Sequence, residues 1–239
     1  MESTVKTVRM TETPEAPDKR PPYVGEAYVD EPVILPSYAE APPRLVAGTL
    51  CLDFLNTVNR PRDGQPPNER LRDYGELLHW AAAAGALDKH DVRDLKYGAI
   101  AQPRAAALAL DNAIALREAL ALLFGDSSEG TGTALTRVNE LLARAPRRQR
   151  LVPRGEGYAW RIEQSEEDLE RPLWQVLWDA AALLTSDRLA HIRSCAAPDC
   201  GWLFLDLTRN RRRRWCSMED CGNRAKARRH YAKKKGHQA

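Results

Sequence analysis

Apolar residues recur at every third or fourth position through much of the chain between residues 71 and 185. This spacing is typical of amphipathic helices that pack on a core by one face. Glycine and proline mark where several of these stretches begin or end. The pattern predicts helices over residues 71–85, 88–97, 103–125, 135–145 and 169–185, and a short helical lead-in at 187–193.

Residues 150–163 follow a different period. Tyr158, Trp160 and Ile162 alternate with Ala159 and Arg161, after a turn at residues 155–157. Alternation with period two, bounded by glycine, predicts a β-hairpin. Residues 44–187 are therefore expected to form a mainly α-helical body that carries one small hairpin.

The first 43 residues hold eight of the sixteen prolines, with scattered charge and little periodicity. Such a segment buries too little apolar surface to form a core, so residues 1–43 are predicted to be a disordered tail. Tyr38 is one of several apolar residues there that could lie over the body in extended form.

The apolar run at residues 45–58 opens the body, and its second half is consistent with a helix. Asp53, Asn56 and Thr57 interrupt this run at spacings of three and four, so they are expected to share one helix face. They either cap and hydrogen-bond locally or form an effector-binding or interface face. Arg117, mid-helix among apolar residues, is either a salt-bridge residue or a further member of this candidate effector site.

Four of the five cysteines lie near the C-terminus, in two pairs of equal internal spacing. They are Cys195, Cys200, Cys216 and Cys221. Two close cysteine pairs provide the tetrahedral thiolate set of one structural Zn²⁺. Disulfides, a catalytic zinc and an iron–sulfur cluster are weaker alternatives, because a reducing compartment disfavours the first and four thiolates leave a zinc no open position. Gly201 is expected to let the first knuckle turn tightly.

The residues around these cysteines predict a small β-hairpin and a helix. Strands are expected at residues 202–207 and 212–216, with a turn at 208–210, and a helix at 224–234. A knuckle, a hairpin and a helix that supplies the last ligand make a treble-clef-like zinc finger over residues 188–239. Because this segment has few apolar residues, metal binding is expected to supply much of its folding free energy, and loss of one ligand is expected to unfold it while the body survives.

Charge divides the chain in two. Residues 188–239 carry a formal charge of +10, whereas residues 1–187 carry −7. A concentrated basic block favours a polyanionic partner, and clustered arginine and lysine are typical of nucleic-acid surfaces. The candidate nucleic-acid-binding residues are Arg209, Arg211, Arg212, Arg213, Arg224, Lys226, Arg228, Arg229 and Lys233.

Motifs of other functional classes are missing from the sequence. His79, His90 and His191 are isolated, and neither a phosphate-binding glycine loop nor a Gly-x-Ser-x-Gly elbow occurs. We therefore expect no enzyme. The sequence also has no run of about eighteen apolar residues and no secretory signal, which predicts no membrane association and a cytoplasmic location.

Two motifs resemble known bacterial families. The string Trp215-Cys216-Ser217-Met218, followed by Cys221-Gly222-Asn223-Arg224, is similar to the CGNR zinc finger. Leu52-Asp53-Phe54-Leu55-Asn56-Thr57 resembles the opening of the ABATE domain, which typically precedes that finger. The resemblance implies a stress-responsive transcription regulator with a helical ABATE body and a DNA-binding finger.

The leading hypothesis is a DNA-binding transcriptional regulator, associated with the nucleoid, whose finger docks on double-stranded DNA. The helical body would then sense a small-molecule effector or mediate interactions. An RNA-binding or ribosome-associated factor is the first alternative, because the same basic surface would serve it. The second alternative is an enzyme or small-ligand-binding protein with its site in the body, near Asp53, Asn56 and Arg117.

Overall fold

The structure is a computed structural model, which describes residues 36–125, 129–146, 149–162 and 168–236. The predicted disordered tail therefore lies outside the described residues up to residue 35. Its last part packs on the body: Tyr38 is buried, its N–H donates to Glu76 Oε2 at 2.7 Å, and the Arg70 guanidinium lies 4.1 Å from its ring centre. The ordered chain thus begins before Arg44.

The predicted helices of the body are all present. Their bounds are α1 Leu50–Leu55, α2 Tyr74–Ala83, α3 Lys89–Ala101, α4 Pro103–Phe124, α5 Thr131–Arg144 and α6 Arg171–Leu184. Local chemistry fixes several ends. Asp73 caps α2, Asp88 and Asp91 form a capping box on α3, and Pro103 opens α4. Gly48, with φ +88°, turns the chain just before α1. The helix therefore covers only the middle of the apolar run at residues 45–58.

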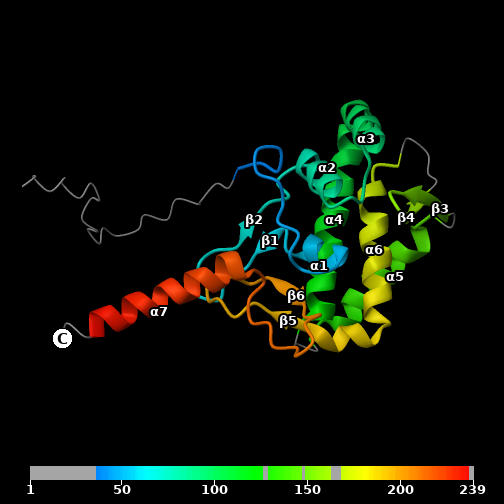
Figure 1. The fold of residues 1–239 in the computed structure, drawn as a ribbon. Coiled ribbons are helices and arrows are strands. Elements are labelled where there is room, and N and C mark those ends of the chain that lie inside the picture. The colour runs from blue at the N-terminus through cyan, green and yellow to red at the C-terminus, as the bar shows by residue number, and fades with distance from the viewer. Residues whose placement is uncertain (1–35, 126–128, 147–148, 163–167, 237–239) are drawn as a thin grey trace, which may run out of the picture. The chain divides into compact units, whose positions relative to one another are not determined.

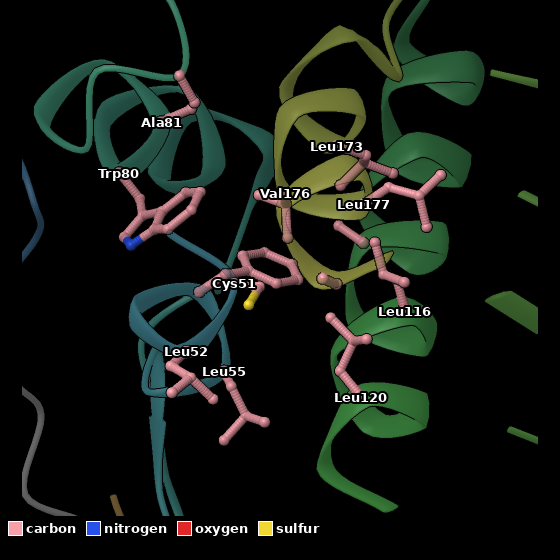
Figure 2. Packing of buried hydrophobic residues seen from close by; sticks show 14 of the residues in the cluster. Cys51, Leu52, Leu55, Trp80, Ala81, Leu116, Leu120, Leu173, Val176 and Leu177 are labelled. Atoms are coloured by element: carbon pink, nitrogen blue, oxygen red, sulfur yellow. The ribbon is translucent and has the colours of Figure 1, made fainter. Parts of the chain in front are cut away.

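The core lies where the helices of the body meet (Figure 1). α1, α2 and α5 each contact both α4 and α6. Side chains from four helices converge there, including Cys51 of α1, Trp80 of α2, Leu120 of α4 and Val176 of α6 (Figure 2). Burial of such side chains, at about 1.5–3 kcal/mol each, stabilises this packing.

Two short strand pairs accompany the helices. β1 (Val58–Asn59) pairs antiparallel with β2 (Asn68–Glu69) directly after α1. β3 (Gln149–Arg154) and β4 (Gly157–Ile162) form the predicted hairpin, with Leu151 opposite Trp160. No helix in the described part of the chain is long and apolar enough to cross a membrane.

The C-terminal region contains a strand pair and a helix, but one strand was placed wrongly by sequence reasoning. The 3₁₀ helix η1 (Asp187–His191) leads into β5 (Ile192–Ser194), which pairs antiparallel with β6 (Leu203–Leu205). A π-helical turn, η2 (Met218–Gly222), continues into α7 (Asn223–Gly236). The second strand predicted at residues 212–216 is irregular instead, and the partner of β6 is the segment before the first knuckle.

Asp206 explains why the chain does not return as a strand. Its Oδ1 accepts from the N–H and the hydroxyl of Thr208 at 3.0 and 2.6 Å, and its Oδ2 accepts from the N–H of Arg213 at 2.9 Å. The carboxylate thus binds backbone donors that a second strand would present to β6. The Arg214 carbonyl instead accepts from Ala196 N–H in the first knuckle, at 2.8 Å.

Candidate metal centre and nucleic-acid interface

The four C-terminal cysteines form one buried cluster. All four Sγ atoms lie within 4.8 Å of one another; Cys200 and Cys216 are 3.8 Å apart, and Cys216 and Cys221 are 3.6 Å apart. Four sulfurs placed tetrahedrally at about 2.3 Å from a zinc ion are about 3.8 Å from each other. The cluster therefore suits one structural Zn²⁺. None of the five cysteines is in a disulfide, and Cys51 lies apart, in the core of the body.

The strand pair and the π-helical turn bring the ligands together. Cys195 directly follows β5, and Cys200 lies three residues before β6, so the first knuckle closes the β5–β6 hairpin. The Cys195 N–H donates to the Trp202 carbonyl at 2.9 Å, which holds the two ends of the knuckle side by side. Cys221 comes from η2, immediately before α7.

Hydrogen-bond donors surround the sulfurs. Arg224 Nη2 lies 3.1 Å from Cys221 Sγ, and the Cys216 N–H donates to Cys195 Sγ at 3.4 Å. Such donors stabilise thiolates, which are the form that binds zinc, and they orient the ligands.

Asn56 joins the body to the finger, which we define as residues 188–239. Its Nδ2 donates to the Leu203 carbonyl at 2.8 Å, and its Oδ1 accepts from the Leu203 N–H at 3.0 Å. Ala47 extends this contact, because its carbonyl accepts from the Leu205 N–H at 2.7 Å. Phe204 and Leu205 are buried in the same hydrophobic cluster as the helices of the body. The finger thus shares its core with the body.

Asn59 and Arg62, which sequence reasoning did not single out, hold the first knuckle from the body side. Asn59 donates to the Asp199 carbonyl at 3.2 Å and accepts from the Gly201 N–H at 2.9 Å. The Arg62 guanidinium donates to the carbonyls of Cys195 and Ala197. Asn59 follows Asn56 by three residues, which is the spacing that separates Asn56 from Asp53. It lies just after the apolar run at residues 45–58, and sequence reasoning considered only polar residues within that run.

Glycine is required at position 201 because the backbone of the body comes very close to it, and not because of the tight turn that we expected. A Cβ atom at this position would lie 2.0 Å from the carbonyl oxygen of Arg60. The finger backbone therefore touches the body backbone at a point where no side chain fits.

The four candidate effector residues do not share one site. Arg117 is 2% exposed and pairs with both carboxylate oxygens of Glu69, at 2.7 and 2.5 Å. It also donates to Glu118 and to the Thr57 hydroxyl. Arg117 and Thr57 thus belong to a salt-bridge network within the body that is centred on the buried Arg117 and reaches two half-exposed carboxylates. This agrees with the salt-bridge interpretation of Arg117.

Asp53 and Asn56 line a cleft instead. The cleft has a volume of about 410 Å³ and lies between the segment around Tyr38, the body and the finger. Asp53 Oδ1 accepts from the Ala47 N–H at 2.9 Å. Burial raises the pKa of the Asp53 carboxyl to about 6.

Arg213 has a different position from the other candidate nucleic-acid-binding residues. Its Nη2 donates to the carbonyls of Val46 and Cys216, its Nε donates to the Trp215 carbonyl, and its guanidinium lies 4.4 Å from the Phe204 ring centre. The Arg213 guanidinium is thus already hydrogen-bonded to three carbonyls and stacked on an aromatic ring. This arrangement favours a structural role over a contact with phosphate.

Arg224 and Arg228 both bind Asp199 of the first knuckle, at 3.0 and 3.1 Å. These two ion pairs fix one face of α7 against the zinc site. The remaining candidates have exposed side chains: Arg209, Arg211, Arg212, Lys226, Arg229 and Lys233.

Comparisons with known families agree with this architecture. Residues 48–187, more than half of the chain, match the ABATE family, described as a putative stress-induced transcription regulator. Residues 191–234 match the CGNR zinc finger. No curated protein matches the chain.

Replacing Cys216 with serine is expected to reduce the zinc content from one ion per chain to none. Because the finger shares its core with the body, the midpoint of thermal unfolding of the helices should also fall, by roughly 5–10 °C. This differs from the expectation of an independent body. Metal analysis and circular dichroism measure both effects. Cys51→Ala is the control and should keep its zinc; a Cys216→Ser chain with one zinc would refute the ligand assignment.

Asn56→Ala leaves the Leu203 N–H and carbonyl without their partner at the junction of body and finger. We expect a loss of about 2–4 kcal/mol in the free energy of unfolding, measured by denaturant titration. Asn139→Ala, on the exposed face of α5, is the matched control and should change stability by less than about 0.5 kcal/mol. Equal effects of the two substitutions would show that this contact does not hold the finger.

Asp53 should make stability depend on pH near neutrality. Its pKa of about 6 in the folded chain exceeds the ordinary value of 3.8, so the folded chain binds the proton more tightly than the unfolded chain. Lowering the pH from 7.5 to 5.5 should therefore stabilise the wild type relative to Asp53→Asn, by less than about 1 kcal/mol. The comparison requires denaturation of both chains at both pH values with excess zinc. A constant difference would contradict the raised pKa.

Proposed function

The chain belongs to the ABATE family, and from this premise we propose that it is a DNA-binding transcriptional regulator whose finger docks on duplex DNA. The observation that carries the proposal is the set of exposed basic side chains on the finger. Arg209, Arg211, Arg212 and Lys226 have no acidic partner in the described part of the chain, so their charge remains available to phosphate.

The two faces of α7 support this proposal, because one face contacts the rest of the finger and the other is exposed. At 100° per residue, Lys226, Arg229 and Lys233 lie on the side of the helix opposite Arg224 and Arg228. One face is anchored to Asp199, and the other presents cations to solvent. An anchored helix with an exposed basic face loses little conformational entropy when it binds a polyanion.

Duplex DNA is a better partner for this helix than structured RNA. α7 has 14 residues and is therefore about 21 Å long, and an α-helix fits the major groove of B-form DNA. The major groove of A-form RNA is too deep and narrow for side chains to read. The basic loop at residues 208–214 would then contact the backbone beside the groove.

The proposal of a binding protein, and not an enzyme, is supported by the contacts of the candidate residues in the body. Arg117 binds the Glu69 carboxylate and the Thr57 hydroxyl, Thr57 donates to the Phe54 carbonyl, and Asn56 binds the finger. These contacts occupy three of the four residues considered for an enzymatic or effector site. A chain that binds DNA in a bacterium would be associated with the nucleoid.

The affinity for duplex DNA should fall steeply with salt. If the six exposed cations each neutralise a phosphate, log Kd should change with log salt with a slope of about 5 in magnitude. Arg211→Ala with Arg212→Ala should weaken binding and reduce this slope by about 2. Fluorescence anisotropy over a salt series measures both quantities.

A double variant elsewhere on the surface serves as the matched control. Lys89→Ala with Arg104→Ala removes the same charge from exposed positions of α3 and α4 and should leave the slope unchanged. Tighter binding of a structured RNA than of duplex DNA would favour the RNA-binding alternative. Equal effects of the two double variants would refute the assignment of the basic surface.

A further inference from the structure

Among the helices of the body that the structure describes, the three most exposed large apolar side chains lie where α3 meets α4. Tyr97, Ile100 and Leu108 are exposed by 69, 78 and 60%, and Gln102 alone separates the two helices. We call these three residues the corner patch. It lies at the end of α4 that is remote from the finger (Figure 1). Exposed apolar patches on folded proteins usually mark a surface that binds a partner.

The outer face of α4 continues this patch. At 100° per residue, positions spaced alternately by four and three residues form one stripe, which is the spacing found in paired helices. The members of this stripe are exposed or partly exposed, and with Ala107 they are Arg104, Leu108, Asp111, Ala115, Glu118 and Leu122. Four of the seven are apolar, whereas the outer face of a surface helix is normally polar. The outer face of α4 is therefore suited to packing on another helix.

Two charged residues lie within this stripe. In the described part of the chain, the exposed side chains of Arg104 and Asp111 have neither an ion pair nor a hydrogen bond. They are seven residues apart, so they share a face of α4 but are separated by about 10 Å along its axis, too far to pair with each other. The positions of α4 that lie three or four residues from either of them are all apolar. Their partners must therefore come from elsewhere.

A second copy of α4 supplies both partners. When two α4 helices pack antiparallel around a two-fold axis between Ala107 and Leu108, this axis lies midway between Arg104 and Asp111. Arg104 of each copy then faces Asp111 of the other, and the symmetry forms the ion pair twice. The small side chain of Ala107 allows a close approach of the two helices. A partner of unrelated sequence would need opposite charges at the same spacing, which this helix already has.

We propose that the chain forms a symmetric homodimer through the corner patch and the outer face of α4. Burial of Leu108 across the axis, with Tyr97 and Ile100 beside it, drives the association. The two ion pairs between Arg104 and Asp111 determine the register of the helices. The finger lies at the other end of α4 and stays exposed. This inference concerns self-association alone and does not rest on the proposed DNA-binding function.

Sedimentation equilibrium of the full-length, zinc-loaded chain tests the proposal, and the wild type should show a monomer–dimer equilibrium. Arg104→Asp and Asp111→Arg each place like charges opposite each other at two symmetric points. Each variant should therefore weaken the dimer at least about tenfold at low salt. A chain with both substitutions has the opposite charges in reversed order, so it should dimerise within about threefold of the wild type.

Mixing the two single variants is the most specific test. The Arg104→Asp chain carries acidic residues at both positions, and the Asp111→Arg chain carries basic residues at both. Together they should form a heterodimer about as stable as the wild-type dimer, although each alone is mainly monomeric. Native mass spectrometry distinguishes the three species. Because the two substitutions are on separate chains, a change in the fold of either chain cannot produce this rescue.

Ile100→Ser tests the apolar part of the interface and should weaken the dimer about tenfold. Tyr158→Ser, on the β3–β4 hairpin, is the matched control, because Tyr158 is also 78% exposed but lies outside the corner patch. This control should dimerise like the wild type. Circular dichroism and zinc content verify that both variants are folded. Equal weakening by the two substitutions would refute the assignment of the interface.

Two further results would overturn the proposal. One is a wild type that remains monomeric at about 200 µM, including a monomer in which nuclear Overhauser contacts join Leu108 to residues before 36. The other is a dimer that none of the substitutions affects. DNA binding is a separate measurement, because on a duplex that accommodates one finger the salt slope depends on the cations of that finger and not on Arg104. A dimer that binds no DNA would refute the regulator function only.

Discussion

Asn56 binds both polar groups of the Leu203 backbone, and the arrangement of the finger depends on this pair of hydrogen bonds. Among the strands of the described residues, β6 pairs with β5 alone, so its other edge would present unpaired N–H and carbonyl groups. The body satisfies that edge with the Asn56 amide and the Ala47 carbonyl. Phe204 and Leu205 can then enter the core of the body, which gives the small finger hydrophobic burial that it cannot generate alone.

Asp199 extends this connection to the basic helix. Its carbonyl accepts from Asn59 of the body, while its carboxylate binds Arg224 and Arg228 of α7. The knuckle is therefore held by zinc ligands, by the body and by α7 at once. A change in how the knuckle sits on the body would reach α7 through Asp199 and through the zinc ligand Cys221, which directly precedes this helix. This is the physical route that connects the body with the basic surface of α7.

The sequence was sufficient for the helices and the metal ligands, because periodicity, caps and cysteine spacing are local signals. The prediction of a second strand in the finger, at residues 212–216, was wrong because the Asp206 carboxylate binds backbone donors that strand pairing needs. Periodicity also showed that Asp53 and Asn56 share a face, but it did not reveal that this face meets the finger. Arg213 illustrates the same limit. The sequence gives Arg213 and Arg212 the same charge, and only the packing shows that the Arg213 side chain contacts Val46 and Phe204.

Gly201 has a consequence for how this finger can be inherited or transplanted. The Arg60 carbonyl leaves no room for a side chain at that position, so the contact requires one particular backbone on each side. A finger moved to another scaffold would keep its four sulfurs but lose the surface that completes its fold. The body and the finger of this chain are therefore expected to tolerate change at this contact only when substitutions on its two sides compensate each other.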